Sequence, residues 1–131
     1  ESSAASDVYK RQQEDIREVQ MAKGAIAAGI ELMMEELEIT YEQVDRVILC
    51  GAFGTYMNAK SAARIGLIPE PLLSKVIAGG NAAGMGCRQI TMDQKLFALT
   101  GELVQKIEPL DLASLPQFQR TFAKHMAFSE V

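Results

Sequence analysis

The apolar residues between Gln13 and Glu38 recur at spacings of three and four, which predicts one long amphipathic helix with a single stripe facing a core. The middle of this helix is thin, because Gly24 and Gly29 flank a stretch rich in alanine. Each glycine weakens a helix interior by roughly 1 kcal/mol relative to alanine. We therefore expect the helix to pass close to another backbone or to a ligand, and we favour tight packing on a sheet.

Glutamates gather near the end of this predicted helix, where the helix dipole disfavours negative charge. They are Glu31, Glu35, Glu36 and Glu38. A metal site would need a second cluster of ligands, which the sequence does not offer. We expect these glutamates to form a solvated face.

Two short apolar runs predict strands. The first, Val44–Cys50, ends in four apolar residues without alternation, which is typical of a strand buried on both faces of a parallel sheet. The second covers residues 75–78. Each run ends at glycines and leads into a predicted helix, over residues 58–65 after the first run and over residues 82–104, with a break near Thr91, after the second.

The two ends of the chain complete the predicted order of elements. Residues 106–112 are predicted as an edge strand, where Pro109 is tolerated, and residues 115–128 as a last amphipathic helix. Alternation of helices and strands in this way predicts a layered α/β fold with a mostly parallel sheet. Residues 1–12 have no amphipathic pattern, so we expect a disordered leader that is not native, followed by one folded unit over residues 13–131.

The overall charge excludes several classes of function. The 131 residues carry a formal net charge of −4, which argues against a nucleic-acid binder or a binder of anionic membranes. No run approaches the roughly 18 apolar residues that span a bilayer, and the polar residues 1–15 do not form a secretory signal. The sequence therefore predicts a cytoplasmic protein with neither nucleic acid nor membrane as a partner.

Cys50 and Cys87 are the two cysteines of the chain, and they belong to no Cys-x-x-Cys motif. Each stands in an apolar or small-residue stretch, so we expect two buried thiols in a reducing compartment, with a disulfide or metal site as the alternative. These residues alone cannot hold an iron–sulfur cluster, which usually needs four cysteines.

The glycines after the two strands are the best candidates for a binding site. In open α/β sheets, ligands bind where strands end and helices begin, and residues 51–54 and 79–84 both occupy such a junction. Missing side chains let the backbone approach a flat ring or a phosphate, and free N–H groups at a helix start favour anions. The residues alone therefore support a nucleotide-sized ligand, and they leave open whether its ring or its phosphates lie here.

More specific motifs are absent from the sequence. It contains no dinucleotide fingerprint, no P-loop and no Gly-x-Ser-x-Gly nucleophile elbow. The single histidine, His125, is expected to be a surface or partly packed residue of the last helix. No catalytic residue and no metal ligand is therefore assigned.

Four ordered blocks give the chain a resemblance to a known family. They are QEDIREVQMAKGAI from Gln13, LCGAFGTYMN from Leu49, SAARIGLIP from Ser61 and GGNAAGMGC from Gly79. Together they resemble the C-terminal part of the reductive activators of corrinoid proteins, over about residues 13–128. That family has the acetate and sugar kinase/heat-shock-70/actin fold, which is ribonuclease H-like, and this chain is similar to its second half.

The resemblance implies a site for ATP. In that fold a glycine turn after a strand backs the adenosine, and a second small-residue helix lies near the hinge between the lobes. The residues that match these positions are Gly51, Ala52, Phe53 and Gly54 for the turn and Asn81, Ala82 and Gly84 for the helix. The usual turn has a double glycine, whereas this chain has Gly-Ala-Phe-Gly.

The resemblance also implies a mechanism and partners. The activators return a corrinoid protein from Co(II) to Co(I) with an electron from an iron–sulfur domain, and ATP drives this uphill step by changing their affinity for the corrinoid partner. The Mg and phosphate ligands and the cluster are expected in an N-terminal part outside this chain. We expect the full-length protein to hydrolyse ATP and these residues alone to be inactive, while a homodimer stays open.

Other functions are compatible with the same residues. The lobe could belong to an activator of 2-hydroxyacyl-CoA dehydratases or to a sugar or acyl kinase. It could also serve only docking or oligomerisation, with glycines that matter for packing alone.

Overall fold

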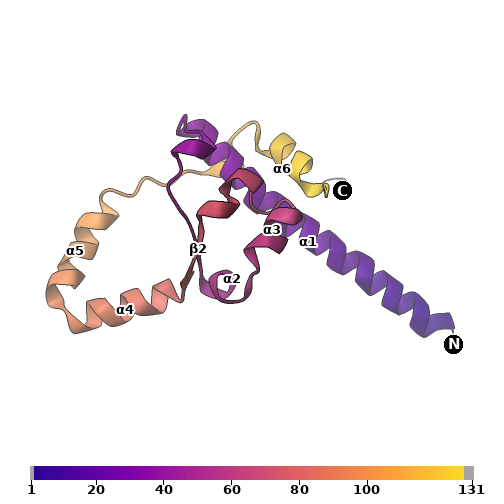
Figure 1. Ribbon diagram of the computed structural model, residues 1–131, viewed down its shortest axis with the longest axis horizontal. Helices are drawn as coiled ribbons and strands as arrows, with labels where there is room; N and C mark the ends of the chain where they lie inside the picture. Colours follow the sequence, from indigo (N-terminus) through magenta and orange to yellow (C-terminus); the bar gives the residue numbers. More distant parts are fainter. Residues whose placement is uncertain (1, 129–131) are drawn as a thin grey trace.

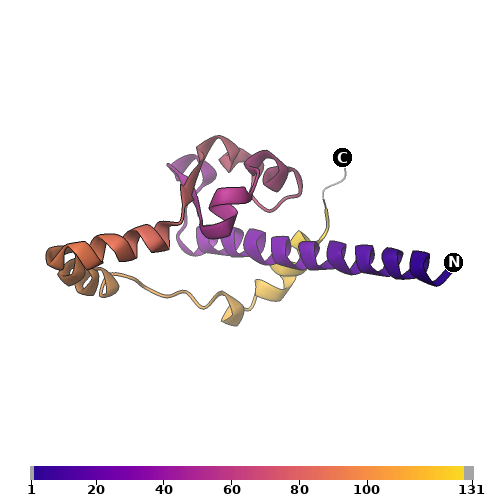
Figure 2. The ribbon, with the colours of Figure 1, turned by 90° about the horizontal axis from the view of Figure 1, so that it is seen from below.

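The computed structural model describes residues 2–128, with side chains from Gln12 onwards except that of Phe53. One long helix, α1 (Ser2–Glu36), forms the spine of the molecule. Figures 1 and 2 show a small α/β body on one side of α1, a last helix on another side, and a separate pair of helices that extends away from both.

Helix α1 starts earlier than the sequence predicted. We expected a disordered segment over residues 1–12, but residues 2–12 continue the helix, while residue 1 lies outside the described residues. The physical reason is that no glycine or proline occurs between Ser2 and Lys23, so nothing in the sequence stops the helix from extending. It ends at Glu36, close to the predicted Glu38.

The sheet has two parallel strands, β1 (Val47–Cys50) and β2 (Val76–Gly80). Val47 lies opposite Val76, and a bulge after Leu49 places Cys50 opposite Gly80. The predicted α/β class with a parallel sheet is therefore confirmed. Between the strands the chain forms three short helices: α2 (Gly51–Tyr56), α3 (Ala59–Arg64) and the 3₁₀ helix η2 (Glu70–Lys75).

The predicted edge strand over residues 106–112 is wrong. There the chain leaves a helix and runs as a loop into a short 3₁₀ helix, η3 (Leu112–Ser114). The N–H groups of Lys106 and Ile107 donate to carbonyl groups of the preceding helix, and Pro109 has no N–H to donate. A strand needs a neighbour to pair with, and the apolar pattern of a segment does not show whether one is available.

Local signals place the helix after β1 correctly. The side chain of Asn58 accepts a hydrogen bond of 3.0 Å from the N–H of Ser61 and so caps the start of α3. Gly66, just after its end, has a φ of 77°, a conformation that glycine adopts without strain. The helix predicted over residues 58–65 is confirmed.

A lysine joins the two segments that lead into the strands. The Lys75 Nζ donates to the carbonyl oxygens of Tyr41, Glu42 and Val44, at 2.8, 3.0 and 2.6 Å. Tyr41 and Glu42 belong to the 3₁₀ helix η1 (Tyr41–Gln43) before β1, and Lys75 ends η2 before β2. One cation therefore holds the entrances of both strands together.

The core of the α/β body lies between α1, α3 and η2. Its buried side chains are Ala62, Leu67, Ile68 and Leu72, and Ile30 of α1 packs against them. The apolar stripe predicted for α1 is only partly buried, because Ile16, Val19 and Leu37 stay exposed in this chain.

Helix α6 (Phe118–Met126) packs across the thin middle of α1. A Cβ added at Gly24 would lie 3.2 Å from Met126 Cγ and 3.3 Å from its backbone N, so the two backbones approach closely. Lys23, only 2% exposed, donates a hydrogen bond to the carbonyl of Ala127 beyond the end of α6. Burial lowers the pKa of Lys23 from its ordinary value. The expected close approach of two backbones is therefore confirmed, but the partner at Gly24 is helix α6 and not the sheet that we favoured.

The remaining two helices form an arm, defined here as α4 (Ala82–Met92) and α5 (Gln94–Val104). They are separated at Asp93, close to the predicted break near Thr91, and the Asp93 side chain accepts a hydrogen bond from the N–H of Lys95. Neither helix contains a buried residue. Figure 2 shows the arm extending beyond the body.

The two cysteines differ from the expectation of buried thiols. Cys50 at the end of β1 and Cys87 on α4 are both exposed and unpaired. Ile48 near Cys50 and Met85 near Cys87 are exposed too, so an apolar sequence environment did not produce burial of the thiols within this chain. None of the helices described between residues 2 and 128 combines the length and the apolar character needed to cross a bilayer.

Candidate functional site

The two glycine junctions lie side by side at one end of the sheet. Because β1 and β2 are parallel and Cys50 pairs with Gly80, the turns that follow the two strands leave the sheet at the same edge. Six of the seven predicted site residues are placed there with their side chains described. They are Gly51, Ala52, Gly54, Asn81, Ala82 and Gly84, whereas for Phe53 only the backbone in α2 is described.

The first junction needs glycine at two positions. Gly51 has a φ of 71°, the left-handed region that favours glycine, and it turns the chain directly from β1 into α2. A Cβ at Gly54 would collide with the carbonyl oxygen of Leu49. The hydroxyl of Thr55 donates to the carbonyl of Gly51 at 3.1 Å and closes this turn. The segment predicted as a turn is therefore a single short helix held against its own strand.

The second junction is organised by Asn81. Its side-chain oxygen accepts a hydrogen bond of 2.9 Å from the N–H of Gly84 and caps α4. A Cβ at Gly84 would lie 2.5 Å from Asn81 Nδ2, so the cap requires glycine at this position. Gly80, just before the cap, has a φ of 56°. The cap uses one N–H of the first turn, while Ala82 and its neighbour begin the helix at the exposed edge.

Gly79 is a further residue of this edge, which the sequence placed in the junction over residues 79–84 but not among the predicted site residues. A Cβ there would lie 2.7 Å from Cys50 Sγ and 2.8 Å from Ile48 Cγ2, on the neighbouring strand. Because Gly79 has no Cβ, the ends of β1 and β2 can come together. The signal in the sequence was the glycine pair Gly79-Gly80, which could mark either a turn or a cross-strand contact.

The chemistry of this edge is that of an uncharged platform. The predicted site residues carry glycine, alanine, one aromatic and one amide side chain, and none is charged. Backbone and small side chains can lie against a flat ring or a sugar, while phosphate groups need cations or several free N–H groups. The platform therefore fits the nucleoside part of a nucleotide, and it offers no charged ligand for the phosphates.

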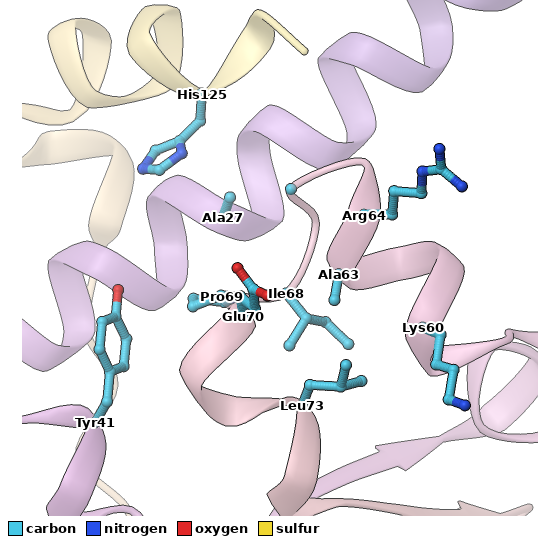
Figure 3. A pocket seen from close by; sticks show the side chains of 11 residues that line it. Ala27, Tyr41, Lys60, Ala63, Arg64, Ile68, Pro69, Glu70, Leu73 and His125 are labelled. Atoms are coloured by element: carbon cyan, nitrogen blue, oxygen red, sulfur yellow. The ribbon is translucent and has the colours of Figure 1, made fainter. Parts of the chain in front are cut away.

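A concavity lined by none of the platform residues lies elsewhere, between α1, α3, η2 and α6. It has a volume of about 560 Å³, and its lining includes Tyr41, Lys60, Arg64, Glu70 and His125. Figure 3 shows that the Lys60 and Arg64 side chains extend away from His125 rather than toward a common point. Its cations do not converge, so this concavity does not form an anion site.

His125 in that concavity is already engaged in a hydrogen bond with Glu31. Its Nε2 lies 2.6 Å from Glu31 Oε2, and the Lys124 Nζ lies 2.8 Å from Glu31 Oε1. Burial alone would raise the pKa of Glu31, but the hydrogen bonds from Lys124 and His125 outweigh it and hold this pKa below its ordinary value. The expectation of a solvated glutamate face is therefore wrong for Glu31, although Glu35, Glu36 and Glu38 are exposed. His125 is partly packed, as predicted.

Metal binding finds no support in the part of the chain that the structure describes. There, no three histidine, cysteine, aspartate or glutamate side chains gather closely enough to hold an ion. A divalent cation at this platform would therefore need ligands from other residues or from the phosphates of a nucleotide.

Comparison with known proteins gives one family. A protein-family model, described as the C-terminal domain of RACo, the ASKHA domain, matches residues 1–131 of this chain. A corrinoid activation enzyme, RamQ of Eubacterium limosum, is 30% identical over 118 residues, which cover 90% of this chain and 20% of that protein. A reductase of the Co(II) methylated amine-specific corrinoid protein from Methanosarcina barkeri is 28% identical over 95 residues, covering 72% of this chain and 17% of that protein.

A solved structure gives the same result in three dimensions. The reductive activator for corrinoid, iron–sulfur protein superposes with a TM-score of 0.81 and 33% identity over 88% of this chain and 18% of the other. The chain thus spans about a fifth of the length of the relatives that it matches.

Proposed function

Because the chain belongs to the family of C-terminal ASKHA domains described for RACo, we propose that it forms the adenosine side of the ATP site in a reductive activator of a corrinoid protein. The whole protein would return Co(II) corrinoid to Co(I) by adding one electron from an iron–sulfur domain. The fold of the chain and the names of its relatives support this assignment.

The observation that carries the proposal is the meeting of the two glycine junctions at one uncharged edge of the sheet. Gly51 and Gly80 turn the chain away from paired strand ends, and Asn81 holds the start of α4 beside them. In this arrangement Ala52 and Ala82 would lie against the adenosine, with Phe53, Gly54 and Gly84 completing the platform. These residues orient the nucleoside and leave the phosphates directed away from the platform.

The phosphate ligands and Mg would come from the other lobe of the full-length protein. Bound ATP supplies the free energy for the uphill reduction. The contribution of this chain is to bind the nucleoside more tightly in one arrangement of the lobes than in another, since a ligand shifts an equilibrium only by differential binding. These residues alone would hydrolyse no ATP, and the cluster would lie in an N-terminal iron–sulfur domain.

The partner of the full-length protein would be a corrinoid protein, as the names of the relatives indicate for those proteins. Within this chain, residues 13–131 would act as one lobe. A homodimer remains compatible with this function, because the proposed cleft is built within one polypeptide.

Calorimetric titration of the full-length protein with Mg–ATP tests the proposal. Ala82→Asp places a negative charge at the platform, in a first helical turn where aspartate is tolerated, and should weaken ATP binding by at least about tenfold. The matched control is Ala59→Asp, because Ala59 follows Asn58 at the start of α3 as Ala82 follows Asn81 at the start of α4. The control should bind ATP as the parent does.

Two results would contradict the proposal. One is a parent protein that binds no ATP, which together with intact binding of a corrinoid protein would favour a docking lobe. The other is equal ATP affinity in Ala82→Asp and in the parent protein, since the nucleoside would then bind elsewhere.

A further inference from the structure

The arm exposes large apolar side chains. Met92 on α4 is 76% exposed, and Phe97 and Val104 on α5 are each 64% exposed. Both helices also carry polar side chains, which are Arg88, Gln89 and Thr91 on α4 and Gln94, Lys95, Thr100 and Glu102 on α5. Each helix is therefore amphipathic, and its apolar face is left without a partner in this chain.

The arm could not keep its helices without further packing. Each helix is eleven residues long, and isolated helices shorter than roughly 12–15 residues are marginal in water. Glycines weaken them further, by roughly 1 kcal/mol each relative to alanine. The two helices contact each other, but neither buries a residue in this chain, so further stabilising contacts must come from outside it.

Two of these glycines point to close contact with an absent neighbour. A Cβ added at Gly86 on α4 or at Gly101 on α5 would meet nothing within 4 Å, whereas one at Gly24 in α1 would press on Met126. Gly101 stands between Phe97 and Val104 at spacings of four and three, so the three residues share one helical stripe. A glycine between two large apolar residues forms a notch that another element can enter.

We propose that the arm is an intramolecular docking surface, covered in the full-length activator by an apolar element of the rest of the polypeptide. The relatives are about five times as long as their match to this chain, so the proteins of this family have enough further polypeptide to supply such a cover. The cover must be permanent, because an uncovered arm would lose its helices. A partner that binds and leaves, such as a corrinoid protein, does not meet this condition.

The position of the arm favours the same polypeptide over a second copy of this chain. Asn81 caps the start of α4, so the exposed arm continues directly from the platform of the glycine junctions. On the proposed function, the other lobe must reach this platform to supply phosphate ligands. The uncharged junction residues of a second copy could not do so. One neighbouring lobe that completes the ATP site and covers the arm accounts for both exposed surfaces.

Cys87 provides a natural probe of the cover. It is exposed on α4 in this chain, and trypsin would release it in the peptide of residues 76–88, between Lys75 and Arg88. The full-length protein is treated with a maleimide, native and in denaturant, and the labelling rate of this peptide is measured by mass spectrometry. We expect the native rate to be at least about tenfold lower than the denatured rate. The protection should not depend on protein concentration.

A pair of variants then tests whether the stripe on α5 is part of the docking surface. Phe97→Glu places a charge in the proposed interface and should raise the labelling rate of Cys87. Gln94→Glu adds the same charge to an exposed polar position of α5, in its first turn, and should leave the rate unchanged.

Each outcome decides one point. Native labelling as fast as in denaturant would overturn the proposal, because the arm would then be uncovered. Protection that disappears on dilution, together with dissociation of a dimer in light scattering, would assign the cover to a second copy and also overturn it. Neither readout involves ATP, so a failure of the proposed nucleotide site would leave the test of the arm intact.

Discussion

The α1–α6 pair and the α4–α5 arm are both pairs of helices in contact, but they differ in what they bury. Where α6 crosses α1, Gly24 and Lys23 are buried and backbone lies against backbone. In the arm the helices pack chiefly on each other, and no residue is buried. Figure 1 shows the arm at one end of the molecule, while α6 crosses α1 near the middle.

This difference in burial shows which region is packed by contacts within this chain. The α1–α6 pair joins residues about a hundred positions apart, so it closes the domain within these 131 residues. The arm carries an equally apolar surface with no partner here. A family member of greater length can complete it, and the comparison therefore separates a self-contained region from one that depends on the remaining polypeptide.

The largest effect is expected at the contact between α1 and α6. Gly24→Leu should lower the free energy of unfolding by about 2 kcal/mol. A Cβ at Gly24 would already lie 3.2 Å from Met126 Cγ, so the leucine side chain must displace Met126. Ala22→Leu on the exposed side of α1 is the control and should change it by less than about 0.5 kcal/mol. Urea denaturation measures both, and equal stability of the two variants would contradict the close packing.

A smaller effect is expected from the ion pairs of Glu31. Glu31→Gln should lower the free energy of unfolding by about 1 kcal/mol at neutral pH, because Lys124 and His125 lose their carboxylate. Glu35→Gln, at an exposed position of the same helix, should have no measurable effect.

The pH dependence gives this prediction a sign. Since the pKa of Glu31 is lowered in the folded protein, its contribution is present above its ordinary value of 4.5 and is lost as the pH falls through the folded value. The difference in free energy of unfolding between the parent protein and Glu31→Gln should therefore shrink as the pH falls below 4.5 and through the folded-state pKa of Glu31. A difference that stays constant in acid would contradict the role of the carboxylate.

The smallest change in stability is expected for Gly101→Ala, which distinguishes a covered arm from an uncovered one. In an uncovered helix, Gly101→Ala should stabilise the protein by about 1 kcal/mol, because alanine is the better helix former and its Cβ meets nothing in this chain. If an element of the full-length protein enters the notch at Gly101, the gain should vanish or change sign. Thermal unfolding of the full-length variant measures this, and a full gain would argue against close packing there.

The sequence predicted the local features of the fold well. Spacing of apolar residues placed the helices, and Asn58 with Gly66 bounded α3 correctly. The glycine junctions were recognised at the ends of both strands, and the parallel pairing brought them together as the fold class implied.

The errors concern contacts between distant residues. The segment over residues 106–112 has the pattern of an edge strand but no strand to pair with. Glu31 is paired with residues 93 and 94 positions away, which no local pattern shows. Cys50 and Cys87 were expected to be buried because of their apolar neighbours in the sequence, but both are exposed, since burial depends on packing between elements that a local pattern does not show.

The most direct test of the central claim is photolabelling of the full-length protein with an azido-adenine analogue of ATP. Trypsin would release the platform in two peptides, residues 47–60 and 76–88, which carry the junctions after β1 and β2. We predict that the label is found in one or both peptides and that excess ATP prevents it. Label that ATP displaces only from peptides outside these two segments would contradict the assignment of this chain to the adenosine side of the site.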